Sequence, residues 1–228
     1  MRRGAWRDPG RRLEPRPSPD AGLYRQLAVK LEFELANGVP GHSLLLTAPR
    51  GSSATVEAMM ELGWELAENL GHRVLLVDGS FSESGVAAAT GYGSEPGLAD
   101  VLSGSPDKLE SLVRPTLHER VFVLPTGGSP QGGSAALKAV DFRGVLHRAY
   151  PRFDYLLIQG PPLMEDPRAL LFLPAADRVL LLALEGRTSM EDLEASRRKL
   201  APCPPDQLGL ILVRPPRRWT VGAPDGLR

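Results

Sequence analysis

Residues 43–56 read SLLLTAPRGSSATV, a short apolar run followed by a polar turn. The run is typical of a buried β-strand, and the proline and glycine after it are typical of a loop. Apolar residues then recur at helical spacing from Thr55 to Leu70, and Gly71 is placed to end that helix. The stretch therefore predicts a strand, a loop at the carboxyl end of that strand, and a helix.

The same alternation of strand and helix continues on both sides. Further strands are predicted over residues 74–77, 121–124, 155–158, 179–184 and 208–213, and further helices over residues 23–36, 106–113, 135–148 and 190–200. The strands are continuously apolar, which is typical of parallel strands covered by helices on both faces. The predicted fold class is therefore α/β: a doubly wound, mostly parallel sheet with helices on both faces.

The composition is that of a globular protein. The chain has 228 residues, of which 42% are hydrophobic and 24% charged, and it has no apolar run of about 18 residues that could span a bilayer. We expect a single α/β domain over residues 20–214, a flexible Arg/Pro-rich tail over residues 1–19 and a second flexible tail over residues 215–228. The first residues lack the pattern of a secretory signal, so a cytoplasmic protein is expected.

Charge, cysteine and histidine content argue against several classes of function. The formal net charge of zero argues against a general electrostatic grip on nucleic acid. The single cysteine, Cys203, cannot form an intramolecular disulfide or a cysteine-cluster metal site, and the four histidines show no metal-ligand spacing. Ligands of doubly wound sheets bind at the carboxyl ends of the strands. The candidate site therefore lies at residues 47–55, 78–82, 125–128 and 159–162.

The order of several motifs resembles that of one protein family. The motifs are LYRQL at residues 23–27, TAPRGSS at 47–53, RVLLVD at 73–78, EPGLADVL at 95–102, VLPTG at 123–127, FDYLLIQGPP at 153–162 and EGRT at 185–188. Over residues 22–213 the chain thus resembles the cytoplasmic P-loop tyrosine kinases of bacterial capsule and exopolysaccharide synthesis, which are related to the ParA and MinD ATPases. The resemblance implies a P-loop NTPase-like fold of the SIMIBI type, with a nucleotide site at the strand ends.

The phosphate-binding loop implied by this resemblance is degenerate. The motif Gly-x-x-x-x-Gly-Lys-Ser/Thr brings backbone N–H groups and a lysine to the phosphates, and its hydroxyl holds Mg²⁺. In one register Thr55 stands at the lysine position; in the other Ala54 stands there and Thr55 keeps the hydroxyl. No lysine lies between Lys30 and Lys108. The candidate nucleotide-binding residues are Arg50, Gly51, Ser52, Ser53, Ala54 and Thr55; the alternative is a plain turn with Ser52, Ser53 or Thr55 as helix N-cap.

Two further positions complete the candidate nucleotide site. The family carries Asp-x-Asp-x-Arg after the second strand, whereas this chain keeps Asp78 and has serines at the other two places, 80 and 82. Gln159 stands where the family has an aspartate that orients Mg²⁺, and a neutral amide cannot offset the charge of a divalent ion. The alternative is that Asp78 caps the following turn and that Gln159 hydrogen-bonds the neighbouring loop. No catalytic residue and no metal ligand is therefore predicted.

The predicted helix over residues 23–36 bears on oligomerisation. In the family this helix carries Glu-x-x-Arg-x-x-Arg, which is used in ring assembly, and only Arg25 remains of it here. Arg25 is therefore a candidate oligomer contact. The family's C-terminal tyrosine cluster has no counterpart, since Tyr155 is the last tyrosine of the chain.

These losses favour an inactive member of the family. The first hypothesis is a pseudokinase that acts as a cytoplasmic regulatory or scaffold partner of an inner-membrane polysaccharide co-polymerase and is held at that membrane through it. No cofactor is expected, with weak ATP, ADP or Mg²⁺ binding left open. A second copy of the chain or an active paralogous kinase are further candidate partners, and nucleic acid is not. One alternative is a weakly active ATP-binding tyrosine kinase or ATPase that uses Arg50, Thr55 and Asp78. Another is a ParA- or MinD-like positioning adaptor.

Overall fold

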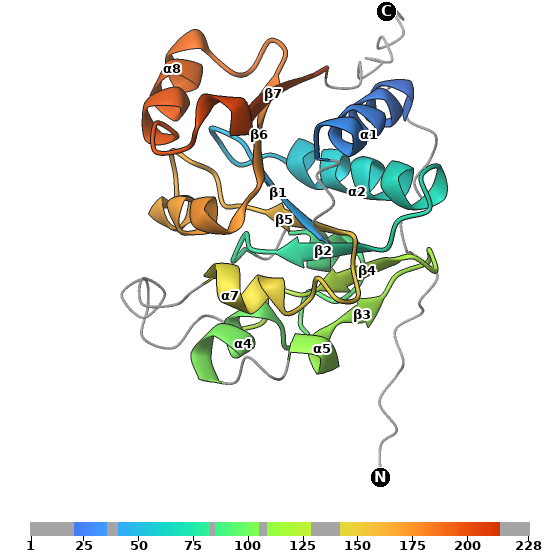
Figure 1. Cartoon of the computed structure of the whole chain (residues 1–228). Coiled ribbons are helices and arrows are strands. Elements are labelled where there is room, and N and C mark those ends of the chain that lie inside the picture. Colours follow the sequence, from blue (N-terminus) through green and yellow to red (C-terminus); the bar gives the residue numbers. More distant parts are fainter. Residues whose placement is uncertain (1–20, 36–40, 83–84, 105–108, 129–141, 215–228) are drawn as a thin grey trace, which may run out of the picture.

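The computed structural model describes residues 21–35, 41–82, 85–104, 109–128 and 142–214 (Figure 1). A seven-stranded sheet lies at the centre, with strand order β3-β4-β2-β5-β1-β6-β7. Every neighbouring pair is parallel except β3 and β4. This confirms the predicted doubly wound, mostly parallel class. The predicted tails over residues 1–19 and 215–228 lie outside the described residues.

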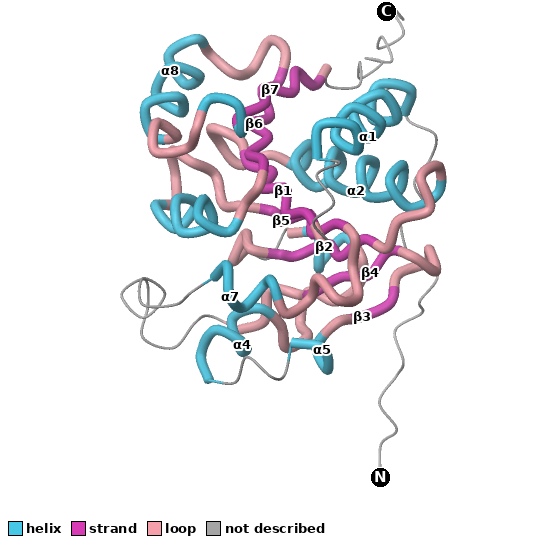
Figure 2. Tube along the Cα trace, in the orientation of Figure 1, coloured by secondary structure: helices cyan, strands magenta, loops and turns pink. Residues whose placement is uncertain are grey.

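Figure 2 shows the row of strands with helices on either side of it. The strands are β1 (His42–Thr47), β2 (Val74–Asp78), β3 (Arg114–Pro115), β4 (Val121–Leu124), β5 (Tyr155–Gln159), β6 (Arg178–Leu184) and β7 (Leu208–Val213). The α-helices are α1 (Ala21–Leu35), α2 (Ser53–Glu68), α3 (Val86–Ala89), α4 (Leu98–Gly104), α5 (Leu109–Leu112), α7 (Phe142–His147) and α8 (Met190–Lys199). Two 3₁₀-helices are η3 (Pro167–Ala175) and η4 (Pro205–Gln207).

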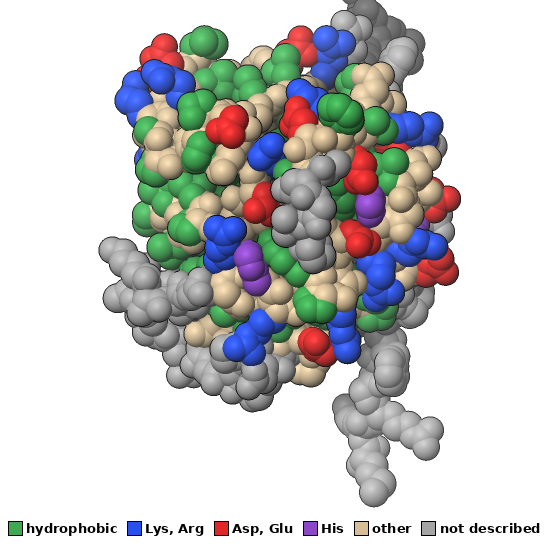
Figure 3. All heavy atoms as spheres, in the orientation of Figure 1, with side chains coloured by type: hydrophobic (Ala, Val, Ile, Leu, Met, Phe, Trp, Pro, Cys, Tyr) green, Lys and Arg blue, Asp and Glu red, His purple; other side chains and the backbone are tan. Residues whose placement is uncertain are grey.

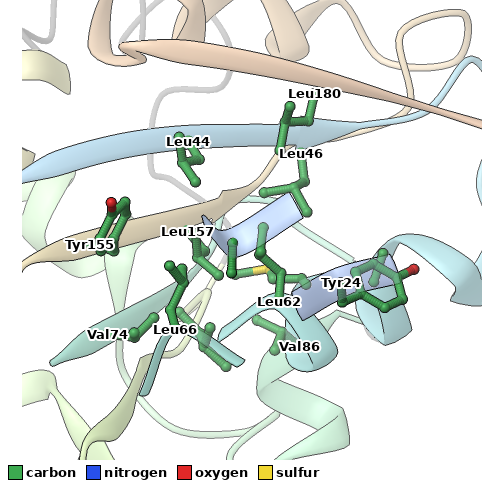
Figure 4. Close-up of a cluster of buried hydrophobic side chains, with 14 of the residues drawn as sticks. Tyr24, Leu44, Leu46, Leu62, Leu66, Val74, Val86, Tyr155, Leu157 and Leu180 are labelled. Carbon is green, nitrogen blue, oxygen red and sulfur yellow. The ribbon is translucent and has the colours of Figure 1, made fainter. Parts of the chain in front are cut away.

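The sheet separates two layers of buried side chains. Successive residues of a strand point to opposite faces, so Leu44 and Leu46 of β1 join one layer and Leu45 joins the other. Figure 4 shows the first layer, in which Leu62 and Leu66 of α2 lie among side chains of the sheet. Helix α1 completes that layer, and α4, α7 and η3 contribute to the second. Burial on both faces explains why the central strands are continuously apolar.

Strand β7 departs from that rule. It is the last strand of the sheet and pairs only with β6. Ile211 packs against the core, whereas the side chains of Leu210 and Leu212 are 61% and 65% exposed. The prediction that all strands are covered on both faces is therefore wrong for β7, because Leu210 and Leu212 lie on the face opposite Ile211 and that face is exposed there.

The predicted helices are confirmed with shifted ends. Helix α2 runs over Ser53–Glu68 instead of residues 55–70, and Gly71 adopts a φ of +77°, the left-handed conformation of a residue that ends a helix. The predicted helices over residues 106–113 and 135–148 are described only as α5 and α7, since residues 105–108 and 129–141 lie outside the described part. Helices α3, α4 and η3 and strand β3 were not predicted.

Two properties of the whole molecule concern membranes and charge. Among the described residues, no helix has the length and apolar character needed to cross a membrane. Figure 3 shows acidic and basic side chains mixed over the visible face, in line with the formal net charge of zero.

Candidate functional site

The predicted candidate residues meet at one cavity of about 320 Å³. It lies where the carboxyl ends of β1, β2 and β5 face the start of α2, as expected for this fold class. The lining residues are Ala48, Arg50, Gly51, Ser52, Ser53, Thr55, Ser80, Ser82, Gln159, Gly160 and Pro162. The structure thus brings together every candidate residue except Ala54 and Asp78, which are buried beside the lining.

The loop after β1 is a capped helix start. Ser52 has extended backbone angles, φ −157° and ψ 143°, and its Oγ accepts a hydrogen bond from the N–H of Ala54 at 3.1 Å. Ser52 is therefore the N-cap of α2, which confirms one of the three predicted caps. Ala54 and Thr55 follow in the first turn of the helix and are 8% and 5% exposed.

Arg50, the one cation of the loop, is engaged with helix α8. Its Nη2 and Nε lie 3.0 and 3.2 Å from the two carboxylate oxygens of Asp192. The hydrogen bond with Asp192 raises the pKa of the Arg50 guanidinium, and the same contact lowers the pKa of the Asp192 carboxyl. Arg50 therefore stays protonated, and its charge is paired with that of Asp192. The motif comparison gave no sign of Asp192, which is 142 residues away in sequence.

A second acidic side chain reaches the loop itself. Oε1 of Glu165 accepts a hydrogen bond from the backbone N–H of Gly51 at 3.2 Å. Its other oxygen lies 3.2 Å from where a Cβ on Gly51 would stand, so a larger residue would crowd this contact. The family holds phosphate with the backbone amides of this loop. Here the amide of Gly51 is already hydrogen-bonded to a carboxylate of the chain itself. Sequence reasoning also missed Glu165.

Asp78 is 1% exposed and is bound to protein donors through both oxygens. Oδ1 accepts hydrogen bonds from the N–H and the hydroxyl of Ser80, at 3.1 and 2.6 Å, and Oδ2 accepts one from the N–H of Ala87 at 2.9 Å. The interpretation of Asp78 as a turn cap is confirmed. The same carboxylate also holds the first turn of α3.

Gln159 also stabilises the start of α3. Its Oε1 accepts a hydrogen bond from the N–H of Val86 at 2.7 Å, which confirms the predicted contact with a neighbouring segment. Asp78 and Gln159 stand opposite each other on β2 and β5, so together they satisfy the first two amides of α3.

The segment after β2 contains Phe81, whose backbone conformation is unusual and whose ring packs against two neighbouring side chains. This residue has a φ of +50°, a strained value for a side chain of its size. Its ring centroid lies 6.2 Å from that of Phe172 and 4.7 Å from the guanidinium carbon of Arg168. The strained turn directs Ser80 and Ser82, whose hydroxyls are 3.2 Å apart, toward the cavity.

Arg25 lies away from this cavity, on α1. Its Nε is 3.1 Å from Oε2 of Glu65 on α2, and 60% of its side chain is exposed. The predicted oligomer contact therefore has a partner within its own chain, and its role between chains stays a prediction.

The cavity offers little to a magnesium–nucleotide complex. Among the described residues, its lining contains hydroxyls, backbone amides, one paired arginine and one glutamine, and no lysine or aspartate. No group of three or more His, Cys, Asp or Glu side chains in the described part is arranged to hold a metal ion. The residues present do not fit the Mg²⁺ that the family implies, because Asp78 is already bound to three donors and Gln159 is neutral.

Comparison with known proteins identifies the relatives of this chain. No family model matches it. Tyrosine-protein kinase CpsD of Streptococcus agalactiae is 27% identical over 192 residues, which are 83% of this chain and 81% of the relative. Tyrosine-protein kinase YwqD of Bacillus subtilis is 24% identical over 199 residues, 87% of this chain and 82% of the relative. The chain is a homologue of bacterial tyrosine-protein kinases.

Solved structures agree with the fold of this kinase homologue. The kinase domain of the Escherichia coli tyrosine kinase ETK superposes with a TM-score of 0.76 at 20% identity, covering 91% of this chain and 80% of that one. MinD of Pyrococcus horikoshii, solved with Mg-ADP, superposes with a TM-score of 0.56 at 22% identity, covering 75% and 68%. The kinase homologue therefore has the P-loop fold shared by these kinases and MinD.

Proposed function

We propose that this kinase homologue is a catalytically inactive pseudokinase of bacterial capsule or exopolysaccharide synthesis, acting as a cytoplasmic regulatory or scaffold partner of a membrane polysaccharide co-polymerase. One observation carries the proposal. Asp78, which remains from the family's Asp-x-Asp-x-Arg motif, and Gln159, which stands where the family has an aspartate that orients Mg²⁺, are buried and bonded to the backbone of α3. They serve the fold instead of a ligand.

The electrostatics of the cavity support inactivity. Phosphoryl transfer depends on cations and dipoles that stabilise the charge developing on the transferred group. Here Arg50 is paired with Asp192, and Glu165 adds a carboxylate at the amide of Gly51. Both arrangements make the loop less favourable for a triphosphate than a lysine-bearing loop would be.

The partner follows from the resemblance. By that resemblance, relatives without a membrane segment of their own dock on the cytoplasmic ends of a co-polymerase. The buried core of this chain is intact although the charged residues of the family's nucleotide site are mostly replaced, so the fold is available as a binding surface. In this proposal the chain is peripheral at the inner membrane through that partner. A second copy or an active paralogous kinase are further candidates for the bound protein.

A second candidate function is a weakly active ATP-binding kinase or ATPase. The observation in its favour is that the cavity persists and faces the N-terminus of the 16-residue helix α2, where backbone amides favour anions. A third, a positioning adaptor, is favoured only by the similarity of fold to MinD.

Calorimetric titration of the full chain with Mg-ATP separates the first two candidates. We expect no binding tighter than about 1 mM for the wild-type chain and no phosphate release. Glu165→Gln removes one negative charge at the loop, so residual ATP binding should tighten about two- to fivefold, while the matched variant Glu194→Gln on α8, whose side chain pairs with Arg198, leaves it unchanged. A wild-type Kd below about 0.1 mM, with phosphate release abolished by Arg50→Ala, would contradict inactivity.

The partner is tested by co-purification with the polysaccharide co-polymerase from the same bacterium. The proposal expects a stable complex whose amount does not change when Mg-ATP is added. Failure of the co-polymerase to retain the chain, or retention only with ATP, would argue against an inactive partner.

A further inference from the structure

A second hollow lies at the opposite edge of the sheet from the candidate site. It has a volume of about 570 Å³ and is formed by the end of α2 and the turn that precedes β4. Its lining residues, which we call the Trp64 groove, are Trp64, Ala67, Glu68, Gly71, Leu117, His118, Glu119 and Arg120. Because β4 begins at Val121, this turn is at the amino edge of the parallel sheet.

The groove is built around Trp64 and His118. Their rings meet edge to face, with centroids 4.7 Å apart. The backbone N–H of Arg120 donates to Nδ1 of His118, so Nε2 carries the hydrogen that is donated to Oε2 of Glu68 at 3.0 Å. These contacts hold an indole beside a carboxylate whose side chain is 63% exposed. Glu119, on the turn, is 85% exposed.

The surroundings of the groove favour a cation. Helix α2 contains four glutamates, at positions 57, 61, 65 and 68, and no lysine or arginine. The helix ends in the groove, and the C-terminus of a helix carries partial negative charge. Arg120 already lies in the groove: it donates to the carbonyl oxygen of Gly71, in the turn after α2, and its Nε is 3.7 Å from Oε1 of Glu119. An aromatic face next to carboxylates is a general way to bind a guanidinium or ammonium group.

One segment of this chain has the matching chemistry. Residues 1–20 contain six arginines against three acidic residues, and they include Trp6. The segment joins the fold at Ala21, one helical turn before Arg25, which contacts Glu65 beside Trp64. Twenty residues can extend about 66–72 Å, so the groove is within reach. A short tether also gives an effective concentration of roughly millimolar, enough to populate a weak contact.

We propose that the arginine-rich segment of residues 1–20 binds in the Trp64 groove of its own chain, with an arginine against the Trp64 ring and guanidinium groups paired with Glu68 and Glu119. The contact couples the N-terminal segment to the face of the molecule opposite the candidate nucleotide site. A basic partner protein that docks on the groove would have to displace this segment first.

Photocrosslinking of the full chain tests the proposal. The photoreactive residue p-benzoylphenylalanine replaces Trp6, and the irradiated protein is analysed by mass spectrometry. We expect crosslinks within one chain to residues 64–71 and 117–120. The yield should fall about fivefold or more in the double variant Glu68→Gln/Glu119→Gln, which removes two exposed charges, while the amide oxygen at position 68 keeps an acceptor for Nε2 of His118.

The matched control is Glu191→Gln/Glu194→Gln, which removes the same charge from α8 and should leave the yield unchanged. Circular dichroism establishes that both double variants fold. Crosslinks that fall elsewhere, that join two chains, or that form equally in both double variants would overturn the proposal. Crosslinks to the groove that persist undiminished in about 0.5 M salt would also contradict it, because exposed ion pairs are screened there.

Discussion

The carboxylates of Asp78 and Glu165 differ in burial and in hydrogen-bond partners, and these differences determine what each one does. Asp78 is buried and receives hydrogen bonds from Ser80 and Ala87, so its charge is used to hold a turn and a helix start. Glu165 is exposed and contacts the amide of Gly51 at the cavity. Asp78, which remains from the family's Asp-x-Asp-x-Arg motif, thus stabilises the fold, and Glu165, which lies outside the family motifs, faces the loop.

Replacing Asp78 by Asn should therefore lower stability. The amide keeps one acceptor but turns an NH₂ group toward the N–H of Ala87, which leaves a buried donor without a partner. We expect the free energy of unfolding to fall by about 1–3 kcal/mol, measured by urea denaturation. Asp206→Asn, at an exposed position, should change it by less than about 0.5 kcal/mol. Equal effects for the two variants would contradict a structural role for Asp78.

The sequence predicted part of this site. The capping roles of Asp78, Gln159 and Ser52 followed from their positions at strand and helix ends, where side chains satisfy free backbone groups. The contacts of Asp192 and Glu165 could not be predicted, because they join residues 142 and 114 positions apart and no periodicity specifies such pairs.

At the scale of the element, the start of helix α4 lies directly against the end of β4. Its first amides do not bond within the helix: Leu98 N–H donates to the carbonyl oxygen of Pro125 at 2.8 Å, and Ala99 N–H donates to that of Thr126 at 2.9 Å. The end of β4 therefore supplies the acceptors for the helix start. This arrangement requires Gly97, because a Cβ there would lie 1.9 Å from the carbonyl oxygen of Pro125.

Gly97→Ala should consequently destabilise the protein by about 3 kcal/mol or more, since backbone atoms must move to relieve the overlap. Gly22→Ala is the matched control: nothing lies within 4 Å of its Cβ position, and alanine favours helix, so stability should rise by up to about 1 kcal/mol. Thermal unfolding of the two variants measures the difference. A Gly97→Ala protein as stable as the wild type would refute the close-packing account.

The strands were predicted more accurately than the helices. Six of the seven strands begin and end within one residue of the prediction, because buried parallel strands form continuous apolar runs. Strand β3 has two residues and α3 has four, too few for a periodic pattern. Helix η3 was not predicted because it contains Pro174, and proline disfavours the interior of a helix. The segment is stabilised by packing, since Phe172 lies in the core.

At the scale of the molecule, the amino edge of the sheet gathers ionisable groups between α1 and β5. Tyr155 donates its hydroxyl to Glu32 at 2.8 Å, and the ring of His42 lies 5.5 Å from that of Tyr155. Burial lowers the pKa of His42, with His72 and Arg178 adding to the effect and Asp177 and Glu32 opposing it. Folding thus favours neutral His42.

A stability that depends on pH follows from this shift. In the unfolded chain His42 binds its proton near pH 6.5, whereas in the folded chain it does so at lower pH. Its contribution is therefore fully present above about pH 6.5 and is lost as the pH falls toward the folded-state value. Urea unfolding at about pH 7.5 and 5.5 should show a smaller loss of stability on acidification for His42→Gln than for the wild type. The same loss in both proteins would exclude His42 as its source.

The place of β5 in the sheet has a consequence for synthesis on the ribosome. β5 lies between β1 and β2, yet Gln159 follows Asp78 by 81 residues. At roughly 5–20 residues per second, that stretch takes about 4–16 s to translate. During this interval two leucine-rich strands have left the exit tunnel without the neighbour that will join them. We expect nascent chains of this protein to need a holding chaperone until β5 emerges.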